Sequence, residues 1–194
     1  MVKEIVTGIR STAVLWLLTA IVYPAFMLLV GQGIFPYQAN GSLITNAQNQ
    51  VVGSALMGQS FTAANYFRSR PSVASYSEGA DAQPTGISGA SNLAPSNPEL
   101  IDRVDSTAAD LQQANIPLTA DLLYASGSGL DPHISPAAAA AQANAVAIAR
   151  NLTAEQVSQL IADNTQGRFL GLFGEPGVNV TMLNIALDNL AAGN

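Results

Sequence analysis

The sequence contains no cysteine and only one histidine, His133. The absence of cysteine excludes disulfides, thiol nucleophiles and iron–sulfur ligation, so the chain folds without depending on an oxidising environment. A single histidine without cysteine also excludes a zinc site of the usual His/Cys type. The carboxylates are scattered and form no D-x-D-x-D-G calcium loop. We therefore expect neither a metal nor a cofactor.

Charge is also scarce, since charged residues make up 10% of the chain against the ~25% typical of soluble domains. The only lysine is Lys3, and all but one of the 13 acidic residues follow residue 30. The basic residues in that part are Arg68, Arg70, Arg103, Arg150 and Arg168. An acidic domain without a basic patch is a poor candidate for binding nucleic acid or anionic lipid. Its weakly charged surface is either covered by a partner or rich in uncharged polar residues.

One long uncharged stretch predicts a membrane-spanning helix over residues 11–31, STAVLWLLTAIVYPAFMLLVG. About 20 apolar residues at a rise of 1.5 Å cover the ~30 Å hydrocarbon core of a bilayer. Pro24 is tolerated there as a kink. A buried helix of a soluble protein would carry a polar edge. A cleaved signal peptide would have a shorter apolar run and a small-residue cleavage site, which the following GQGIFP does not provide.

The charges that flank this stretch predict its orientation. Lys3 and Arg10 precede it, and the next charged residue is Arg68. The positive-inside rule then keeps residues 1–10 in the cytoplasm and places residues 32–194 across the membrane as one periplasmic or extracellular domain. We expect a single-pass protein of the plasma (inner) membrane.

The patterns beyond residue 32 mix helices and strands without a repeating βαβ order, which favours an α+β domain. The expected helices cover 98–115, after a capping box of Ser96 and Glu99, then 136–150, 154–164 and a final helix around 182–190. The expected strands are a hairpin of 43–44 and 51–57 associated with the Asn40-Gly41 turn, and 168–172 with 178–180 around the turn 174–177. Residues 118–124 fit either a strand or a helical turn, and 72–98 an ordered surface loop.

Arg68 and Arg70 alternate in what reads as an extended segment, which would place both guanidinium groups on one face.

The run 125–136, ASGSGLDPHISP, raises the question of catalysis. Ser128, Asp131 and His133 are the residue types of a hydrolase triad, but Ser128 is out of frame for a G-x-S-x-G elbow. Three triad members within six residues of a turn seldom reach the required geometry. We interpret the run as a structural loop in which Gly127 and Gly129 supply positive φ or close approach. The candidate partner-contact or structural residues are Ser126, Gly127, Ser128, Gly129, Asp131, Pro132, His133, Arg70 and Asn92.

Several motifs, taken in order along nearly the whole chain, resemble one known family. They are Gly58-Gln-Ser-Phe, Tyr66-Phe-x-x-Arg-Pro-Ser, 89–98 (GASNLAPSNP), the run 125–136, and Gly174-Glu-Pro-x-Val-Asn-Val followed by Asn184-x-Ala-Leu-Asp. This pattern resembles the C subunit (KdpC) of the bacterial Kdp potassium-transporting P-type ATPase. Ala94, where the family has glycine, and Arg68, where it often has histidine, depart from the pattern.

The resemblance implies a non-catalytic accessory subunit of a high-affinity, ATP-driven potassium uptake complex. Its partners would be the potassium-selecting channel-like subunit, the P-type ATPase subunit and a small membrane subunit. The family is credited with assembling the complex and with raising its apparent nucleotide affinity, and a domain outside the cytoplasm is badly placed for the second role. Two alternatives from other classes are a membrane-anchored periplasmic hydrolase and an envelope scaffold protein.

Overall fold

The computed structural model describes residues 1–46, 48–78 and 86–192. The chain divides into two compact units, Met1–Leu43 and Ile44–Asn194, which we describe separately. Of the loop expected over 72–98, residues 79–85 lie outside the described residues.

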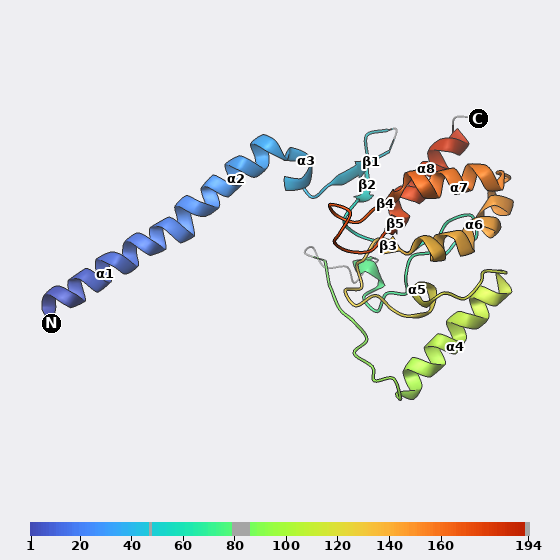
Figure 1. Ribbon diagram of the computed structural model, residues 1–194, viewed down its shortest axis with the longest axis horizontal. Helices are drawn as coiled ribbons and strands as arrows, with labels where there is room; N and C mark the ends of the chain where they lie inside the picture. Colours follow the sequence, from blue (N-terminus) through green and yellow to red (C-terminus); the bar gives the residue numbers. More distant parts are fainter. Residues whose placement is uncertain (47, 79–85, 193–194) are drawn as a thin grey trace. The chain divides into compact units, whose positions relative to one another are not determined.

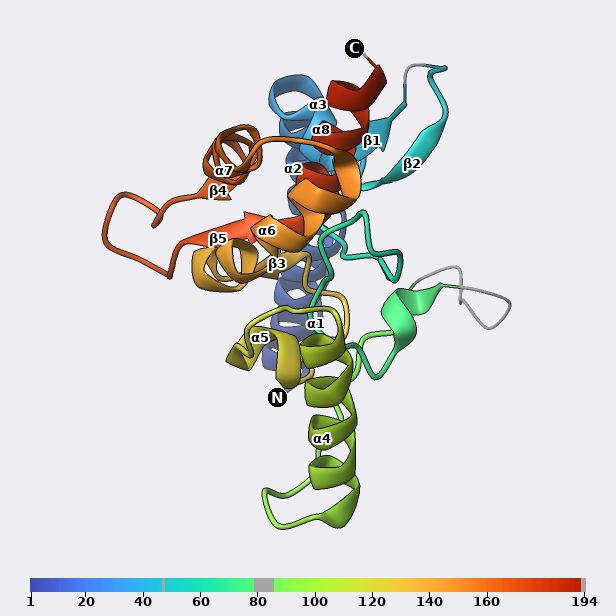
Figure 2. The same ribbon diagram turned by 90° about the vertical axis from the view of Figure 1, so that its right-hand side faces the viewer.

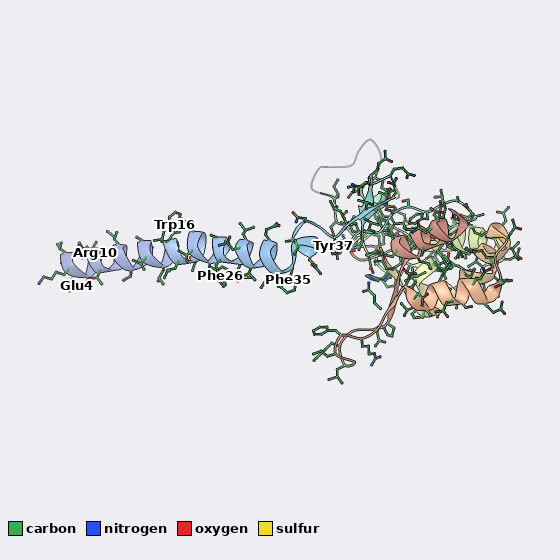
Figure 3. The ribbon with its side chains drawn as sticks, turned by 90° about the horizontal axis from the view of Figure 1, so that it is seen from above. Glu4, Arg10, Trp16, Phe26, Phe35 and Tyr37 are labelled. Carbon is green, nitrogen blue, oxygen red and sulfur yellow. The ribbon has the colours of Figure 1, made fainter. Side chains whose placement is uncertain are left out.

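The first unit consists mainly of one continuous helix, Val2–Ile34. It comprises α1 (Val2–Leu17), a π-helical turn η1 (Leu18–Val22) and α2 (Tyr23–Ile34). None of its side chains is buried, and Trp16 and Phe26 project from opposite sides in Figure 3. With 33 residues and a mean hydropathy of 2.3, it is the only helix in the described ranges long and apolar enough to span a membrane. The expected apolar helix is therefore present and extends beyond 11–31 at both ends.

The π-helical turn lies immediately before Pro24. Proline has no N–H to donate, and its ring clashes with the carbonyl four residues earlier in a regular α-helix. In η1 the Tyr23 N–H instead bonds to the carbonyl of Leu18, five residues back. The wider turn accommodates the proline without ending the helix. Thr19, inside this turn, donates its hydroxyl to the Leu15 carbonyl at 2.8 Å.

A short helix, α3 (Pro36–Ala39), leads to a two-stranded sheet of β1 (Leu43–Thr45) and β2 (Val51–Ser54). The predicted hairpin is confirmed, but its turn and its second strand differ from the prediction. Asn40 and Gly41 follow α3, with Gly41 at φ +87°, and do not join the strands. The connection is instead closed by Asn46, whose N–H donates to the Gln50 carbonyl at 3.0 Å and whose side chain accepts from the Gln50 N–H at 2.9 Å.

The second unit has a three-stranded antiparallel sheet, in the order β3-β5-β4, associated with helices. The strands are β3 (His133–Ile134), β4 (Thr165–Gln166) and β5 (Gly177–Asn179), with His133 opposite Asn179 and Thr165 opposite Val178. The helices are α4 (Pro98–Gln113), α5 (Ala120–Leu123), α6 (Pro136–Arg150), α7 (Ala154–Asp163) and α8 (Val180–Ala192), and η2 (Ser75–Ser77) is a 3₁₀ turn. Helices α6 and α8 contact β5, and α7 packs on both (Figures 1 and 2). The α+β prediction is confirmed.

Most of the predicted helix starts are confirmed by their capping hydrogen bonds. Ser135 accepts from the Ala138 N–H at 3.2 Å, and Thr153 and Gln156 form a reciprocal capping box. The capping box predicted for α4 is wrong by one residue, because Asn97 caps this helix and accepts from the Glu99 N–H at 2.9 Å. An asparagine directly before the first-turn proline is as good a cap as serine. Within residues 118–124, Ala120–Leu123 form the helical turn α5.

The strand predicted over 168–172 is wrong. These residues form a tight turn in which Leu170 and Gly171 have φ of +52° and +73°, and Phe169 pairs with Phe173 in an isolated bridge. The apolar run therefore belongs to the tip of the connection between β4 and β5, which extends away from the remainder of this unit (Figure 2).

The core lies between the sheet and α6, α7 and α8. Its fully or almost fully buried side chains include Phe67, Ile134, Ala138, Val146, Val157, Val178, Val180, Leu183 and Leu187.

Two buried amide side chains hold the segment that carries Phe67 on this core. Asn184 of α8 accepts from the Phe67 N–H and donates to its carbonyl, both at 2.9 Å. Gln142 of α6 binds the Arg68 backbone in the same way, at 2.7 and 3.2 Å. Because buried backbone groups need partners, these two amides replace the neighbouring strand that the segment lacks. We call them the amide clamps.

Candidate functional site

The run 125–136 forms a loop closed by its own hydroxyl groups. The Ser126 side chain is buried and its Oγ accepts from the N–H groups of Ser128 and Gly129, both at 3.2 Å. The Ser126 N–H donates to the Pro71 carbonyl at 2.9 Å. The loop is therefore rigid and is fixed to the segment that follows Arg70.

The same loop also binds three further segments that are distant in sequence, and it makes a second contact with the segment that follows Arg70. Its carbonyls accept from the Gly58 N–H (Leu130, 2.8 Å), the Gly89 N–H (Ser128, 2.9 Å), the Ser72 hydroxyl (Gly129, 2.6 Å) and the Val180 N–H (Pro132, 2.9 Å). The backbone carbonyls of Ser128, Gly129, Leu130 and Pro132 are thus used to organise the domain. This arrangement agrees with the interpretation of the run as a structural loop.

Gly127 and Gly129 differ in their backbone conformation and in the space available for a side chain. Gly129 has φ +70°, and a Cβ built on it would lie 2.7 Å from the Gly89 carbonyl oxygen and 3.0 Å from the Ala74 Cβ. Gly127 has no left-handed φ and no atom within 4 Å of such a Cβ. The backbone requirement predicted for Gly129 is confirmed, and the one predicted for Gly127 is wrong, because the neighbouring segments approach only Gly129.

Gly58 is a backbone requirement that sequence reasoning missed, although the residue belongs to a quoted motif. A Cβ at Gly58 would collide with the ring of Tyr76 and lie 2.8 Å from the Asp131 carbonyl oxygen. Nothing in the local sequence indicates this, since the colliding groups come from distant segments.

Asp131 and His133 form a small charged group with Arg70. The Asp131 carboxylate lies 3.3 Å from His133 Nδ1, accepts from the His133 backbone N–H at 3.0 Å, and lies 3.8 Å from the Arg70 guanidinium. The hydrogen bonds from His133, more than the charge of Arg70, lower the pKa of Asp131 below its ordinary value. The three side chains line a cavity of about 380 Å³ that extends to Glu175 at the base of the β4–β5 connection.

The predicted triad residues do not form a nucleophile–base pair. Ser128 Oγ accepts from the Leu130 N–H and lies 3.2 Å from Ser126 Oγ, while His133 Nδ1 faces Asp131. Among the described residues, no hydrogen bond joins Ser128 to His133. Since an activated serine needs its base within hydrogen-bond reach, this loop lacks that arrangement.

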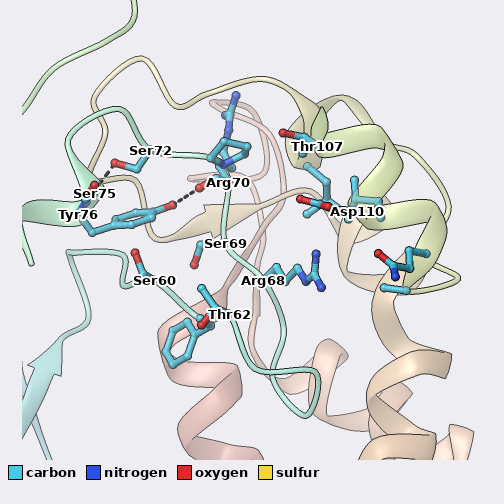
Figure 4. Close-up of a pocket in the computed structure, with 16 residues that line it drawn as sticks. Ser60, Thr62, Arg68, Ser69, Arg70, Ser72, Ser75, Tyr76, Thr107 and Asp110 are labelled. Atoms are coloured by element: carbon cyan, nitrogen blue, oxygen red, sulfur yellow. Dashed lines mark hydrogen bonds between the residues drawn. The ribbon is translucent and has the colours of Figure 1, made fainter. Parts of the chain in front are cut away.

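A second, larger cavity of about 570 Å³ lies between the 60–76 segment and α4 (Figure 4). Arg68 extends toward α4, which carries Thr107 and Asp110, whereas Arg70 points away from it. The expectation that both guanidinium groups share one face is therefore wrong, because the segment is not a regular strand.

Tyr76 lines the same cavity and is a neutral hydrogen-bond donor. Its hydroxyl donates to the Arg70 carbonyl at 2.6 Å, and burial raises the pKa of Tyr76 to about 12. Tyr76 and its neighbours Ser75 and Ser77 all have positive φ, between 45° and 56°. No sequence signal predicts this left-handed turn, because serine and tyrosine do not favour that conformation.

Asn92 is not part of the group formed by Arg70, Asp131 and His133. Its φ is +52°, and its side-chain amide donates to the nearby Ala90 carbonyl at 3.3 Å, so the described contacts are those of a local turn.

Taken together, the fold and the site define an α+β protein with one candidate membrane helix and a loop that binds distant segments of its own domain. A family model described as "K+-transporting ATPase, c chain" matches residues 5–189, and the chain belongs to this KdpC family.

Several relatives are similar over nearly their whole length. The chain is 64% identical over 189 residues to the potassium-transporting ATPase KdpC subunit of Synechocystis sp., covering 97% of this chain and 100% of that protein. It is 55% identical to the subunit of Anabaena sp., covering 97% of this chain and 94% of the relative. It is 50% identical to that of Burkholderia orbicola, covering 97% and 99%. The family resemblance predicted from the motifs is confirmed.

Proposed function

We propose that this chain is a non-catalytic accessory subunit that assembles and stabilises a potassium-transporting ATPase complex. Membership of the KdpC family implies a role in a potassium uptake complex, and hence other subunits. The observation that carries the non-catalytic part is the 125–136 loop, whose hydroxyls and carbonyls are used in hydrogen bonds within the chain. In this proposal its partners are the channel-like subunit, the P-type ATPase subunit and the small membrane subunit.

The proposal includes a topology. Residues 11–31 of the helix Val2–Ile34 span the inner membrane, with residues 1–10 in the cytoplasm, and the domain lies in the periplasm or outside the cell. Lys3 and Arg10 support this orientation, because Glu4 is the only other charged side chain before Arg68. The exposed apolar side chains along the helix support membrane insertion.

The role of the rigid loop in this proposal is to fix the shape of the surface that the domain offers to its neighbours. Asp131 and His133 belong to this loop and Arg70 lies beside it, and all three side chains remain partly exposed. A prefolded surface binds without the entropy cost of ordering, which suits a subunit that stabilises a complex.

The decisive experiment is co-purification of the detergent-solubilised complex through a tag on this chain. We expect the other subunits to be retained, and their recovery and potassium-stimulated ATP hydrolysis to fall together when the loop is disrupted. Recovery of the chain alone from membranes that contain all subunits would contradict the proposal. Loss of turnover in Ser128→Ala or His133→Gln, with full assembly, would instead favour the hydrolase alternative.

The topology has its own test. A reporter enzyme active only outside the cytoplasm, fused after Asn194, should be active, and protease added to spheroplasts should digest most of the chain. A matched fusion to a reporter that works only inside the cytoplasm should be inactive. The reverse pattern would contradict the orientation while leaving the assembly role untouched.

A further inference from the structure

The connection between β4 and β5 exposes four large apolar side chains at its end. Phe169, Leu170, Leu172 and Phe173 are 71%, 74%, 75% and 62% exposed. They are consecutive except for Gly171, and the segment that carries them extends from the domain in Figures 2 and 3. We call these four residues the apolar tip. Scattered exposed apolar residues are normal, but a contiguous group at the end of a projection marks an interaction site.

The apolar tip is a preformed structure. The Phe169 N–H donates to the Phe173 carbonyl at 2.8 Å, and the Phe173 N–H donates back at 3.0 Å. At its base Arg168 binds both carboxylate oxygens of Glu175, at 2.9 and 2.8 Å. Two backbone hydrogen bonds therefore fix the turn, and an ion pair joins the two sides of its base. A tip fixed in this way loses little conformational entropy when it binds. This favours its use as the anchor of a protein interface.

We propose that the apolar tip inserts into an uncharged apolar pocket of another subunit of the same transport complex, an inference that rests on the proposed function. The tip itself carries no charge, and the two charges at its base neutralise each other. An uncharged pocket accepts such a tip without burying an unpaired ion. The aromatic and aliphatic side chains are of the kind that anchors an interface core.

The chemistry of the tip favours a protein over a lipid surface. Segments that dock on membranes combine apolar residues with Lys or Arg and with Trp or Tyr at the headgroup level. The tip has none of these, and the domain that bears it is acidic, so anionic lipid would repel it. The tip therefore matches a protein pocket better than a bilayer.

The chain's lack of cysteine permits a direct test. Leu172→Cys introduces one thiol at the tip, and Glu155→Cys places a matched control at the exposed start of α7. Labelling of this subunit by a membrane-impermeant maleimide is compared in nanodiscs of phosphatidylcholine, for the full chain alone and for the assembled complex. We expect the tip thiol to label at least about tenfold more slowly in the complex than in the chain alone, as for a hot spot buried on binding. The control should label equally in both.

The possible outcomes separate the alternatives. Protection of the tip thiol in the chain alone would overturn the proposal in favour of lipid or of a second copy. Rapid labelling in the assembled complex would overturn it while leaving the accessory role intact. Failure of the unsubstituted chain to assemble would instead count against the proposed function.

A second measurement uses the affinity of the complex. Phe169→Ser combined with Phe173→Ser should lower recovery of the other subunits about tenfold or more after washing in detergent. Ile148→Ser, at a side chain that is 71% exposed on α6, is the matched control and should leave recovery unchanged. Thermal unfolding of each variant should match that of the parent chain, since the substituted side chains are exposed. Equal recovery from the tip variant and the control would overturn the proposal.

Discussion

At the scale of single residues, the 125–136 loop contains one position where only glycine fits and one where a larger residue is tolerated. Gly129 has a left-handed φ and is in close contact with the 72–74 and 89 segments, whereas Gly127 has free space around its Cα. The two positions are two residues apart and share the same hydrogen-bonded loop. Gly127 therefore serves as a matched control for substitutions at Gly129.

We expect Gly129→Val to destabilise the domain strongly and Gly127→Val to have little effect. A β-branched residue at positive φ costs roughly 1–3 kcal/mol in strain, and the collision with the Gly89 carbonyl adds to this cost. Ser128→Ala and His133→Gln should each cost about 1 kcal/mol, the value of one hydrogen bond. Thermal unfolding of the full chain in detergent measures the series. Equal losses at Gly127 and Gly129 would contradict this account of the loop.

Asp131 predicts a pH dependence of stability. Its pKa is below the ordinary value of 3.8, mainly because His133 hydrogen-bonds the carboxylate. The ionised group therefore stabilises the folded state at pH values above 3.8, and this contribution is lost as the pH falls through the lower, folded-state pKa. The carboxylate is about one-third exposed, so solvent screens this contribution.

The comparison is between the parent chain and Asp131→Asn. The parent should unfold at a higher temperature near pH 6, and the difference should shrink steadily below pH 3.8. Asp121→Asn provides a control for removing one carboxylate that also accepts a backbone N–H, that of Ser135 at 2.8 Å. A difference that grows on acidification would contradict the assignment.

At the scale of elements, the amide clamps replace a missing strand. Phe67 and Arg68 belong to a segment without a strand partner, and the side chains of Asn184 and Gln142 satisfy their backbone groups instead. Both amides are essentially unexposed, so water cannot take over their role. The position of this segment, and with it of Arg70, depends on α6 and α8.

We expect Asn184→Ala to cost about 2–6 kcal/mol, because it leaves two buried backbone groups of Phe67 without partners at ~1–3 kcal/mol each. Asn189→Ala, at an exposed position of the same helix, is the matched control and should be close to neutral. Thermal unfolding reports the stability, and hydrogen exchange of the Phe67 amide reports the clamp itself. Slow exchange of that amide in the Asn184 variant would contradict the role given to the side chain.

The elements also show which parts of the fold the sequence could predict. Helices α6 and α7 were predictable because their caps, Ser135 and Thr153, act within three residues of their partners. The strand prediction over 168–172 was wrong because a short apolar run at the surface has the same composition as a buried strand. The amide clamps, and the contact of Gly58 with Tyr76, could not be predicted because they depend on residues brought together only by the complete fold.

The candidate site was likewise predictable only where its contacts are local in the sequence. Hydrogen bonds local to the 125–136 loop and the glycine at 129 were predictable from turn chemistry. The divergence of Arg68 and Arg70, and the left-handed turn at Ser75–Ser77, were not, because neither has a signature in the residues themselves.

At the scale of the whole molecule, the apolar helix should do more than tether the domain. Thr12, Ala13, Thr19 and Ala20 are small side chains suited to close packing against another span. The π-helical turn changes the angular position of Thr19 and Ala20 around the helix axis, compared with a regular α-helix. The Thr19 hydroxyl donates to the Leu15 carbonyl within the same helix. The packing face is therefore set by shape more than by interhelical hydrogen bonds.

Replacing residues 11–31 with an unrelated leucine-rich helix should lower potassium-stimulated ATP hydrolysis of the assembled complex, because larger side chains prevent close approach. A matched leucine-rich helix that keeps Thr12, Ala13, Thr19, Ala20 and Pro24 should restore part of the activity. Unimpaired hydrolysis with the first replacement would mean that the helix is only an anchor.

The amide clamps also have a consequence for how the protein is made. The bonds from Asn184 to Phe67 span 117 residues, and those from Asn179 to Ala55 and from Thr181 to Met57 span 124. During synthesis, the segment around residues 55–67 is made long before β5 and α8, so its backbone groups gain these partners only after both have left the ribosome. A chain truncated before α8 leaves that segment unprotected and open to proteolysis. We expect copies that lack α8 to be degraded before they can occupy a place in a complex.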